Sequence, residues 1–80
     1  MVIIRLHGVL KEELGIKELE VGDGNLIKIL DELPEKVKKV LEKYSQYLLI
    51  LVNGKRIYDL SNTFVSHVDI VDITLPIGGG

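Results

Sequence analysis

The sequence contains no cysteine and no tryptophan, and its charged residues leave a small net charge of −2 at pH 7. Without cysteine the chain has no disulfide, no thiolate metal ligand, and no thiol nucleophile or thioester of its own. Without an excess of basic residues it has no stripe that would neutralise phosphates, which argues against nucleic-acid binding. No apolar run approaches membrane-spanning length, and strand-like sequence begins at once without a signal peptide. We therefore expect a cytoplasmic protein that contacts no membrane.

The chain instead has the composition of one soluble globular domain. Hydrophobic residues make up 46% of its 80 positions and charged residues 28%, a balance that supports a packed core and argues against disorder. The last three residues are all glycine, and a glycine costs more conformational entropy to order than any other residue. We expect residues 1–76 to form the domain and residues 77–80 to form a flexible tail.

Five segments carry the apolar pattern of β-strands, at 2–6, 16–21, 48–52, 55–58 and 69–75. In the first and the last, apolar side chains occupy every second position, which predicts strands with one buried face. The segment 48–52 is apolar throughout and predicts burial on both faces. Asn53-Gly54 follows it directly and predicts a tight hairpin, because both central positions of a type I′ turn require positive φ.

Helical patterns lie between the second and third of these strands. Asn25 is placed to cap a helix that has one apolar face. Pro34 then interrupts the pattern, because an interior proline costs about 3 kcal/mol, and it suits the first position of a second helix. The apolar faces of the two helices are Leu26, Ile29, Leu30 and Leu33, and Val37, Val40, Leu41 and Tyr44. A single helical turn is expected at 10–14, and residues 59–67 are interpreted as an ordered loop pinned by Phe64.

This order of elements predicts an α+β fold of the ubiquitin-like β-grasp type. In that architecture a mixed sheet of about five strands wraps one main helix, here accompanied by a second short helix. The apolar helix face needs an apolar sheet face, and the first and last strands are the most apolar candidates for the centre of the sheet. A ferredoxin-like split βαβ sheet is the alternative, but the Asn53-Gly54 hairpin leaves no room for its second crossover helix.

Several stretches carry a resemblance to a known family. They are the strand Val2-Ile3-Ile4-Arg5-Leu6, the loop Leu10-Lys11-Glu12-Glu13-Leu14-Gly15 followed by Lys17-Glu18-Leu19-Glu20-Val21, the turn Leu51-Val52-Asn53-Gly54, and Asp69-Ile70-Val71 leading to the tail Leu75-Pro76-Ile77-Gly78-Gly79-Gly80. Along its whole length the chain resembles the MoaD/ThiS family of ubiquitin-like sulfur carriers, and most of all the small subunits of molybdopterin synthase. The chain departs from the family pattern at Leu75, which replaces a proline, and at Val68, which stands where a glycine commonly precedes the aspartate. Gly78 stands where an alanine is usual.

The resemblance implies that the chain carries sulfur on the carboxylate of Gly80. At neutral pH that group is an anion and a poor electrophile, because an α-carboxyl group has a pKa of about 3.3–3.7. A ubiquitin-activating-type enzyme would use ATP and magnesium to form an acyl-adenylate, and an external sulfur nucleophile would convert it to a thiocarboxylate. The tail, residues Ile77, Gly78, Gly79 and Gly80, would then be threaded into the active site of the large subunit of molybdopterin synthase. The chain itself would supply no catalytic side chain and bind no cofactor.

Docking to a partner is expected to bury an apolar surface that includes Phe64 and Leu75, with Ile77 entering a groove of the partner. Each of these residues also fits an ordinary core position or a tolerated exposed apolar position. His7 and His67 are interpreted as structural or solvated histidines. No metal site is expected, because no second pair of ligands accompanies them.

Alternative functions stay open. The same chemistry serves thiamine synthesis and tRNA thiolation, although the additional residues at 33–43 argue against the compact thiamine type. A protein modifier would instead join Gly80 to a lysine of a target protein. A β-grasp binding module would form no covalent bond at all.

Overall fold

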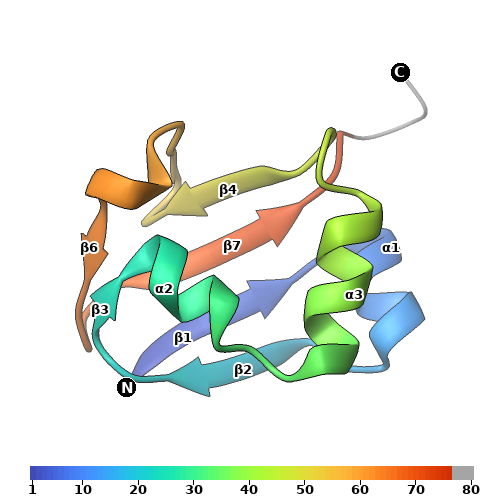
Figure 1. The fold of residues 1–80 in the computed structure, drawn as a ribbon, viewed down its shortest axis with the longest axis horizontal. Helices are drawn as coiled ribbons and strands as arrows, with labels where there is room; N and C mark the ends of the chain where they lie inside the picture. The colour runs from blue at the N-terminus through green and yellow to red at the C-terminus, as the bar shows by residue number, and fades with distance from the viewer. Residues whose placement is uncertain (77–80) are drawn as a thin grey trace.

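The first and last strands of the chain form the centre of the fold. The computed structural model describes residues 1–76, in which a five-stranded mixed sheet has the order β2-β1-β7-β4-β5 (Figure 1). Its strands are β1 (Val2–Leu6), β2 (Glu18–Val21), β4 (Leu49–Val52), β5 (Lys55–Arg56) and β7 (Ile70–Thr74). β1 and β7 run parallel, with Ile4 opposite Val71, and the other pairs in this sheet are antiparallel. The α+β fold and its five-stranded mixed sheet are as predicted.

The helices begin and end where the local sequence requires. They are α1 (Gly8–Leu14), α2 (Leu26–Asp31) and α3 (Glu35–Lys43), followed later by the short 3₁₀ helix η1 (Leu60–Asn62). α1 ends at Gly15, which has a φ of 68° and adopts this left-handed conformation without a Cβ penalty. Asn25 caps α2, since its side chain accepts a 3.0 Å hydrogen bond from the backbone N–H of Ile27. Within residues 1–76, no helix has the length and apolar character needed to cross a membrane.

Pro34 divides the helical region into two short helices, whereas one main helix and a second short helix were predicted. It lies at the N-cap of α3, one position earlier than predicted, and α3 begins at Glu35. The carboxylate of Glu35 lies near the positive end of the helix dipole. α2 has six residues and α3 has nine, so the helix predicted as the main one is the shorter.

The core lies between the helices and one face of the central strands. The strand residues on this face are Val2, Ile4, Leu6, Val71 and Ile73, none of them more than 2% exposed. Buried side chains of all three α-helices join the same core. Each fully buried Leu, Ile or Val contributes about 1.5–3 kcal/mol to the stability of the fold. A second sheet of two strands, β3 (Gly24–Asn25) and β6 (Phe64–Val65), closes one end of the molecule.

Three local predictions are wrong. In the apolar run 48–52 only Ile50 is buried. Leu49 and Leu51 lie on the sheet face away from the core, and Leu48 and Val52 pack against the core but are half-buried. The loop after the hairpin is anchored by Val65, which is 3% exposed, while the neighbouring Phe64 points outward and is 73% exposed. The second strand of the hairpin, β5, is also shorter than the predicted strand 55–58. The N–H of Ile57 still donates a hydrogen bond to the carbonyl of Ile50, but Tyr58 is 80% exposed.

Candidate functional site

The candidate site begins where the chain leaves the sheet at the end of β7. Thr74 is the last residue of this strand and lies opposite Leu49 of β4. The side chain of Leu75 packs half-buried against the core, and Pro76 is exposed. Because proline has no N–H, it cannot continue the hydrogen-bonded ladder. The predicted tail, Ile77, Gly78, Gly79 and Gly80, lies outside the described residues, so the roles assigned to it stay predictions.

A polar cluster lies beside this exit, on the sheet face that points away from the core. We call this the outer face. On the three central strands it is formed by Ile3, Arg5, Leu49, Leu51, Ile70, Asp72 and Thr74, and on the edge strands by Glu18, Glu20 and Arg56. Asp72 accepts two hydrogen bonds from Arg5, of 2.7 Å from Nε and 3.1 Å from Nη2. Nε2 of His7 lies 2.7 Å from the same carboxylate. The backbone N–H of His7 donates to the carbonyl of Ile73, which places His7 next to the last residue of β7.

Within the cluster, the charges of Arg5 and Asp72 stabilise each other. The hydrogen bonds from Arg5 hold the pKa of Asp72 below its usual value, and His7 adds to the effect. The same contact raises the pKa of Arg5. The side chain of Asp72 is only 15% exposed, whereas those of Arg5 and His7 are 48% and 45% exposed. A carboxylate already engaged in this way is a poor general base, so the cluster is better suited to recognition than to catalysis.

Apolar side chains flank the cluster on the outer face. Ile3 lies opposite Ile70, and Leu51 lies on the other side of β7, opposite Asp72. Ile70 is 36% exposed, and the others, including Leu49 at the exit, are half-buried. Apolar side chains around an arginine are a common composition at the centre of protein interfaces. The outer face is therefore the candidate docking surface.

The two predicted docking residues do not lie together. Phe64 is exposed on β6, opposite Asn25 of β3, at the end of the molecule away from the chain exit (Figure 1). Leu75 lies at the exit and packs against the core. A partner that receives the chain end would therefore reach Leu75 and the outer face without contacting Phe64, unless it covers most of the molecule.

The remaining polar residues singled out in the sequence have structural roles or lie free on the surface. His67 is exposed. Asp69 accepts hydrogen bonds of 2.8 Å from the side chain of Asn53 and from the backbone N–H of Ser66, and these bonds lower its pKa. They tie the hairpin turn to the start of β7. In the part of the chain that the structure describes, no three His, Asp or Glu side chains are grouped to hold a metal ion.

Sequence reasoning missed the outer face because the surface depends on strand register. Arg5 and Asp72 are 67 positions apart in the chain, and only the parallel pairing of β1 with β7 brings them together. One indication was available in the sequence. Both residues occupy polar positions in the alternating patterns of the two strands predicted to be central, so a register between those strands would have paired them.

Comparison with known proteins supports the fold. Neither a family model nor a curated protein matches the sequence. Among solved structures, the small archaeal modifier protein 1 of Methanosarcina acetivorans is similar, with a TM-score of 0.76 and 26% identity over 99% of this chain and 95% of that chain. A chain in the complex of subunits 1 and 2 of the molybdopterin-converting factor of Helicobacter pylori gives a TM-score of 0.71 and 24% identity, over 99% of this chain and 97% of that chain. Urm1 of Sulfolobus solfataricus gives a TM-score of 0.70 and 24% identity, over 92% of this chain and 99% of that chain. These likenesses confirm the β-grasp-like fold and agree with the family resemblance seen in the sequence.

Proposed function

We propose that this chain is a ubiquitin-like sulfur carrier that works as the small subunit of a molybdopterin synthase. In this proposal the carboxylate of Gly80 is the reacting group. The chain is charged with sulfur by one partner and discharged by another. ATP is consumed in the charging step, which is consistent with a cytoplasmic location.

The observation that carries the proposal is the position of the chain exit. β7 lies at the centre of the sheet, and the chain leaves it after Thr74 beside the half-buried Leu49, at a margin of the outer face. Beyond Pro76 the sequence supplies one isoleucine and three glycines. Four residues in an extended conformation span about 13–14 Å, enough to carry a carboxylate into a buried active site while the outer face docks. A backbone without Cβ atoms passes through channels that exclude other residues.

The chemistry takes place in two steps, and the partners supply the catalytic groups. In the first, the Gly80 carboxylate attacks the α-phosphorus of ATP, which releases pyrophosphate and forms an acyl-adenylate; magnesium and ATP are bound by a ubiquitin-activating-type enzyme. In the second, a sulfur nucleophile attacks the carbonyl carbon and AMP leaves. With sulfide as the nucleophile the product is the thiocarboxylate. The sulfur must come from outside, because the chain has no cysteine.

The outer face is the proposed docking surface for both partners. It offers half-buried apolar residues next to the exit and two exposed polar side chains, Arg5 and His7, which Asp72 holds in place. The discharging partner is proposed to be the large subunit of molybdopterin synthase. The similar Helicobacter pylori chain comes from a complex of subunits 1 and 2, which supports a partner of this kind.

A second candidate function is protein modification, and a specific observation favours it. The solved structure with a TM-score of 0.76 and 26% identity is a small archaeal modifier protein. The same acyl-adenylate would then be attacked by the Nζ of a lysine on a target protein, which forms an isopeptide bond and releases AMP. Sulfur carriers for thiamine synthesis or tRNA thiolation use the first chemistry with other acceptors.

Mass spectrometry of the intact chain, isolated from its own cell, tests the proposal. A carrier shows a population heavier by the difference between sulfur and oxygen, and that population disappears on reaction with a thiol-specific alkylating reagent that adds its own mass. Co-purification with a large synthase subunit selects the molybdopterin role. Adducts of the chain on lysines of other proteins, without the sulfur-shifted mass, assign the modifier function instead. An unmodified mass without either product contradicts both.

A further inference from the structure

The turn that follows β4 is tied to the start of β7 by the side chain of Asn53. Asn53 and Gly54 form this turn with φ angles of 52° and 83°. Nδ2 of Asn53 donates a 2.8 Å hydrogen bond to Oδ1 of Asp69, and Oδ1 of Asn53 accepts a 3.0 Å hydrogen bond from the backbone N–H of Ile70. Both ends of the amide are therefore in use, and its donor end faces a carboxylate.

The carboxylate of Asp69 is held in place from its other side. Its Oδ2 accepts a 2.8 Å hydrogen bond from the backbone N–H of Ser66, while the N–H of Asp69 donates to the carbonyl of Ser66. The hydrogen bond from Asn53 is the main cause that lowers the pKa of Asp69, and Ser66 and the charge of His67 act in the same direction. Asp69 is therefore a fixed anion at neutral pH, and it requires a hydrogen-bond donor at position 53.

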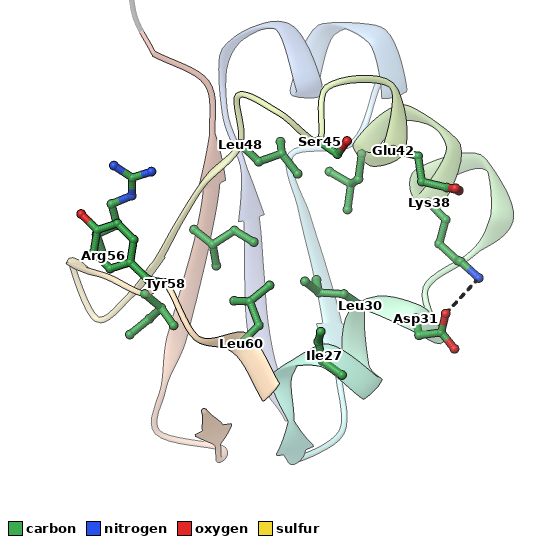
Figure 2. A pocket seen from close by; sticks show the side chains of 13 residues that line it. Ile27, Leu30, Asp31, Lys38, Glu42, Ser45, Leu48, Arg56, Tyr58 and Leu60 are labelled. Atoms are coloured by element: carbon green, nitrogen blue, oxygen red, sulfur yellow. Dashed lines mark ion pairs between the residues drawn. The ribbon is translucent and has the colours of Figure 1, made fainter. Parts of the chain in front are cut away.

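The tip of this hairpin has few other anchors. β5 has two residues, both exposed, which pair with Leu51 and Val52 of β4. Arg56 stacks on Tyr58 of the same segment, 4.6 Å from the ring centre, and Figure 2 shows this pair across a pocket from α3. Local opening of a fold begins in segments with few buried contacts. The hydrogen bonds of Asn53 are therefore important for holding the tip against β7.

Asn53 is followed by the residue that most favours loss of its amide. The chain has three asparagines, and Asn25 and Asn62 are followed by leucine and threonine, whereas Asn53 is followed by glycine. Deamidation begins when the next backbone nitrogen attacks Cγ of the asparagine, and a side chain on that next residue hinders the attack. Gly54 has no side chain that would do so. Asn53 is also exposed, so water reaches it.

We propose that Asn53 is a site of spontaneous deamidation and that this reaction releases the hairpin from β7. The backbone nitrogen of Gly54 attacks Cγ of Asn53, so a C–N bond forms and the Cγ–Nδ2 bond breaks. The proton of the Gly54 amide leaves with Nδ2 as ammonia, and a cyclic imide remains. One water molecule then opens the imide at either carbonyl carbon, which leaves aspartate or isoaspartate at position 53.

Each product removes the donor that Asp69 requires. An aspartate at position 53 is ionised at neutral pH and only accepts hydrogen bonds, so two carboxylates would face each other where the hydrogen bond now lies. An isoaspartate adds one carbon to the main chain of the turn, whose length sets the register of β4 with β5. The turn lies at the end of β4 opposite the chain exit, so this inference does not depend on the proposed sulfur chemistry.

The hydrogen bonds of Asn53 should also slow its deamidation. Ring closure converts the planar amide into a tetrahedral centre, so the bonds to Asp69 and Ile70 have to be given up. Asp69→Ala removes one of them and should raise the deamidation rate about fivefold. Ile4→Val is the control, because it destabilises the fold mildly on the core face and leaves the turn as it is; the rate should not change.

Peptide mapping by mass spectrometry of the full chain, incubated at mildly alkaline pH, tests the site. We expect a product at position 53 that is heavier by the difference between a hydroxyl and an amino group, while Asn25 and Asn62 stay intact. An isoaspartate-specific carboxyl methyltransferase with labelled S-adenosylmethionine detects the isoaspartate independently. The proposal is overturned by the absence of a product at position 53, by equal loss at all three asparagines, or by a rate that Asp69→Ala raises no more than Ile4→Val does.

Two variants test whether the amide holds the hairpin. Asn53→Asp reproduces one product and should lower the melting temperature at pH 7 by about 5–10 °C, because it removes a hydrogen bond and adds a repulsion. The double variant Asn53→Asp with Asp69→Asn exchanges the amide and the carboxylate, which restores a donor between them and should recover most of the loss. An Asn53→Asp variant that melts like the parent chain, or a double variant that recovers nothing, would overturn the proposed release.

Discussion

The two faces of the β1–β7 pair are built from alternate residues of the same strands, yet they differ in almost every physical respect. On the core face Ile4, Val71 and Ile73 are 0% exposed. On the outer face Arg5 and Asp72 form an ion pair that water reaches from one side, between half-buried or exposed isoleucines. The core face determines whether the chain folds. Of these two faces, the outer one is the face that a partner can reach.

The contrast between the two faces is tested most strongly by making the same side-chain truncation on each of them. Ile4→Ala removes a fully buried side chain and should lower the free energy of unfolding by about 2–5 kcal/mol. Ile3→Ala removes the same atoms one residue earlier, from a half-buried outer position opposite Ile70, and should cost about 1 kcal/mol or less. Equilibrium unfolding in urea measures both values. Equal losses would mean that the outer face is as much a part of the core as the inner one.

A charge on the outer face should affect partner binding more than folding. Leu49→Lys places an ammonium group opposite Thr74 at the chain exit, and we expect it to weaken binding to the adenylating partner about tenfold. Phe64→Lys is the matched control, because Phe64 is a more exposed apolar residue at the other end of the molecule. Isothermal titration calorimetry, with melting temperatures of both variants as the check on folding, provides the measurement. A larger loss for Phe64→Lys would restore the docking role that the sequence suggested for Phe64.

The smallest expected effect is on the stability of the fold in acid, which tests the ion pair between Arg5 and Asp72 on the outer face. Arg5 lowers the pKa of Asp72 in the folded state below the ordinary value of 3.8. The carboxylate therefore stabilises the fold above about pH 4, and this contribution is lost as the pH falls through the lower folded pKa. Asp72→Asn should flatten the dependence of unfolding free energy on pH below about pH 4. The dependence should not vanish, because Glu13, Asp59 and Asp69 also have lowered pKa values.

A double-mutant cycle isolates the pair from these other carboxylates. Arg5→Gln and Asp72→Asn should each destabilise the chain at pH 7, and the double variant should lose less than the sum of the two. Additive losses would show that the two side chains contribute separately and that the contact at 2.7 Å is energetically unimportant.

Much of this fold was predictable because its strongest patterns are local. The alternation in β1 and β7, the cap at Asn25, the helix break at Pro34 and the hairpin at Asn53-Gly54 each follow from a few neighbouring residues. The errors at Phe64 and in the run 48–52 arose because burial there depends on which face of a strand meets the helices. The outer-face cluster was missed for the same reason: Arg5 and Asp72 become neighbours only through a pairing of the two ends of the chain. The roles of the tail residues 77–80 stay predictions from the sequence, because these residues lie outside the part of the chain that the structure describes.

The measurement that tests the central claim most directly is ATP–pyrophosphate exchange by the adenylating partner, with the full chain and with a chain that lacks Gly79 and Gly80. The account predicts exchange with the full chain and none with the shortened one. It also predicts nearly identical melting temperatures for the two, because the fold of residues 1–76 does not depend on the end of the chain. Exchange that survives the deletion, or a shortened chain that no longer folds, would contradict the claim that the terminal carboxylate is the working group of a separately stable domain.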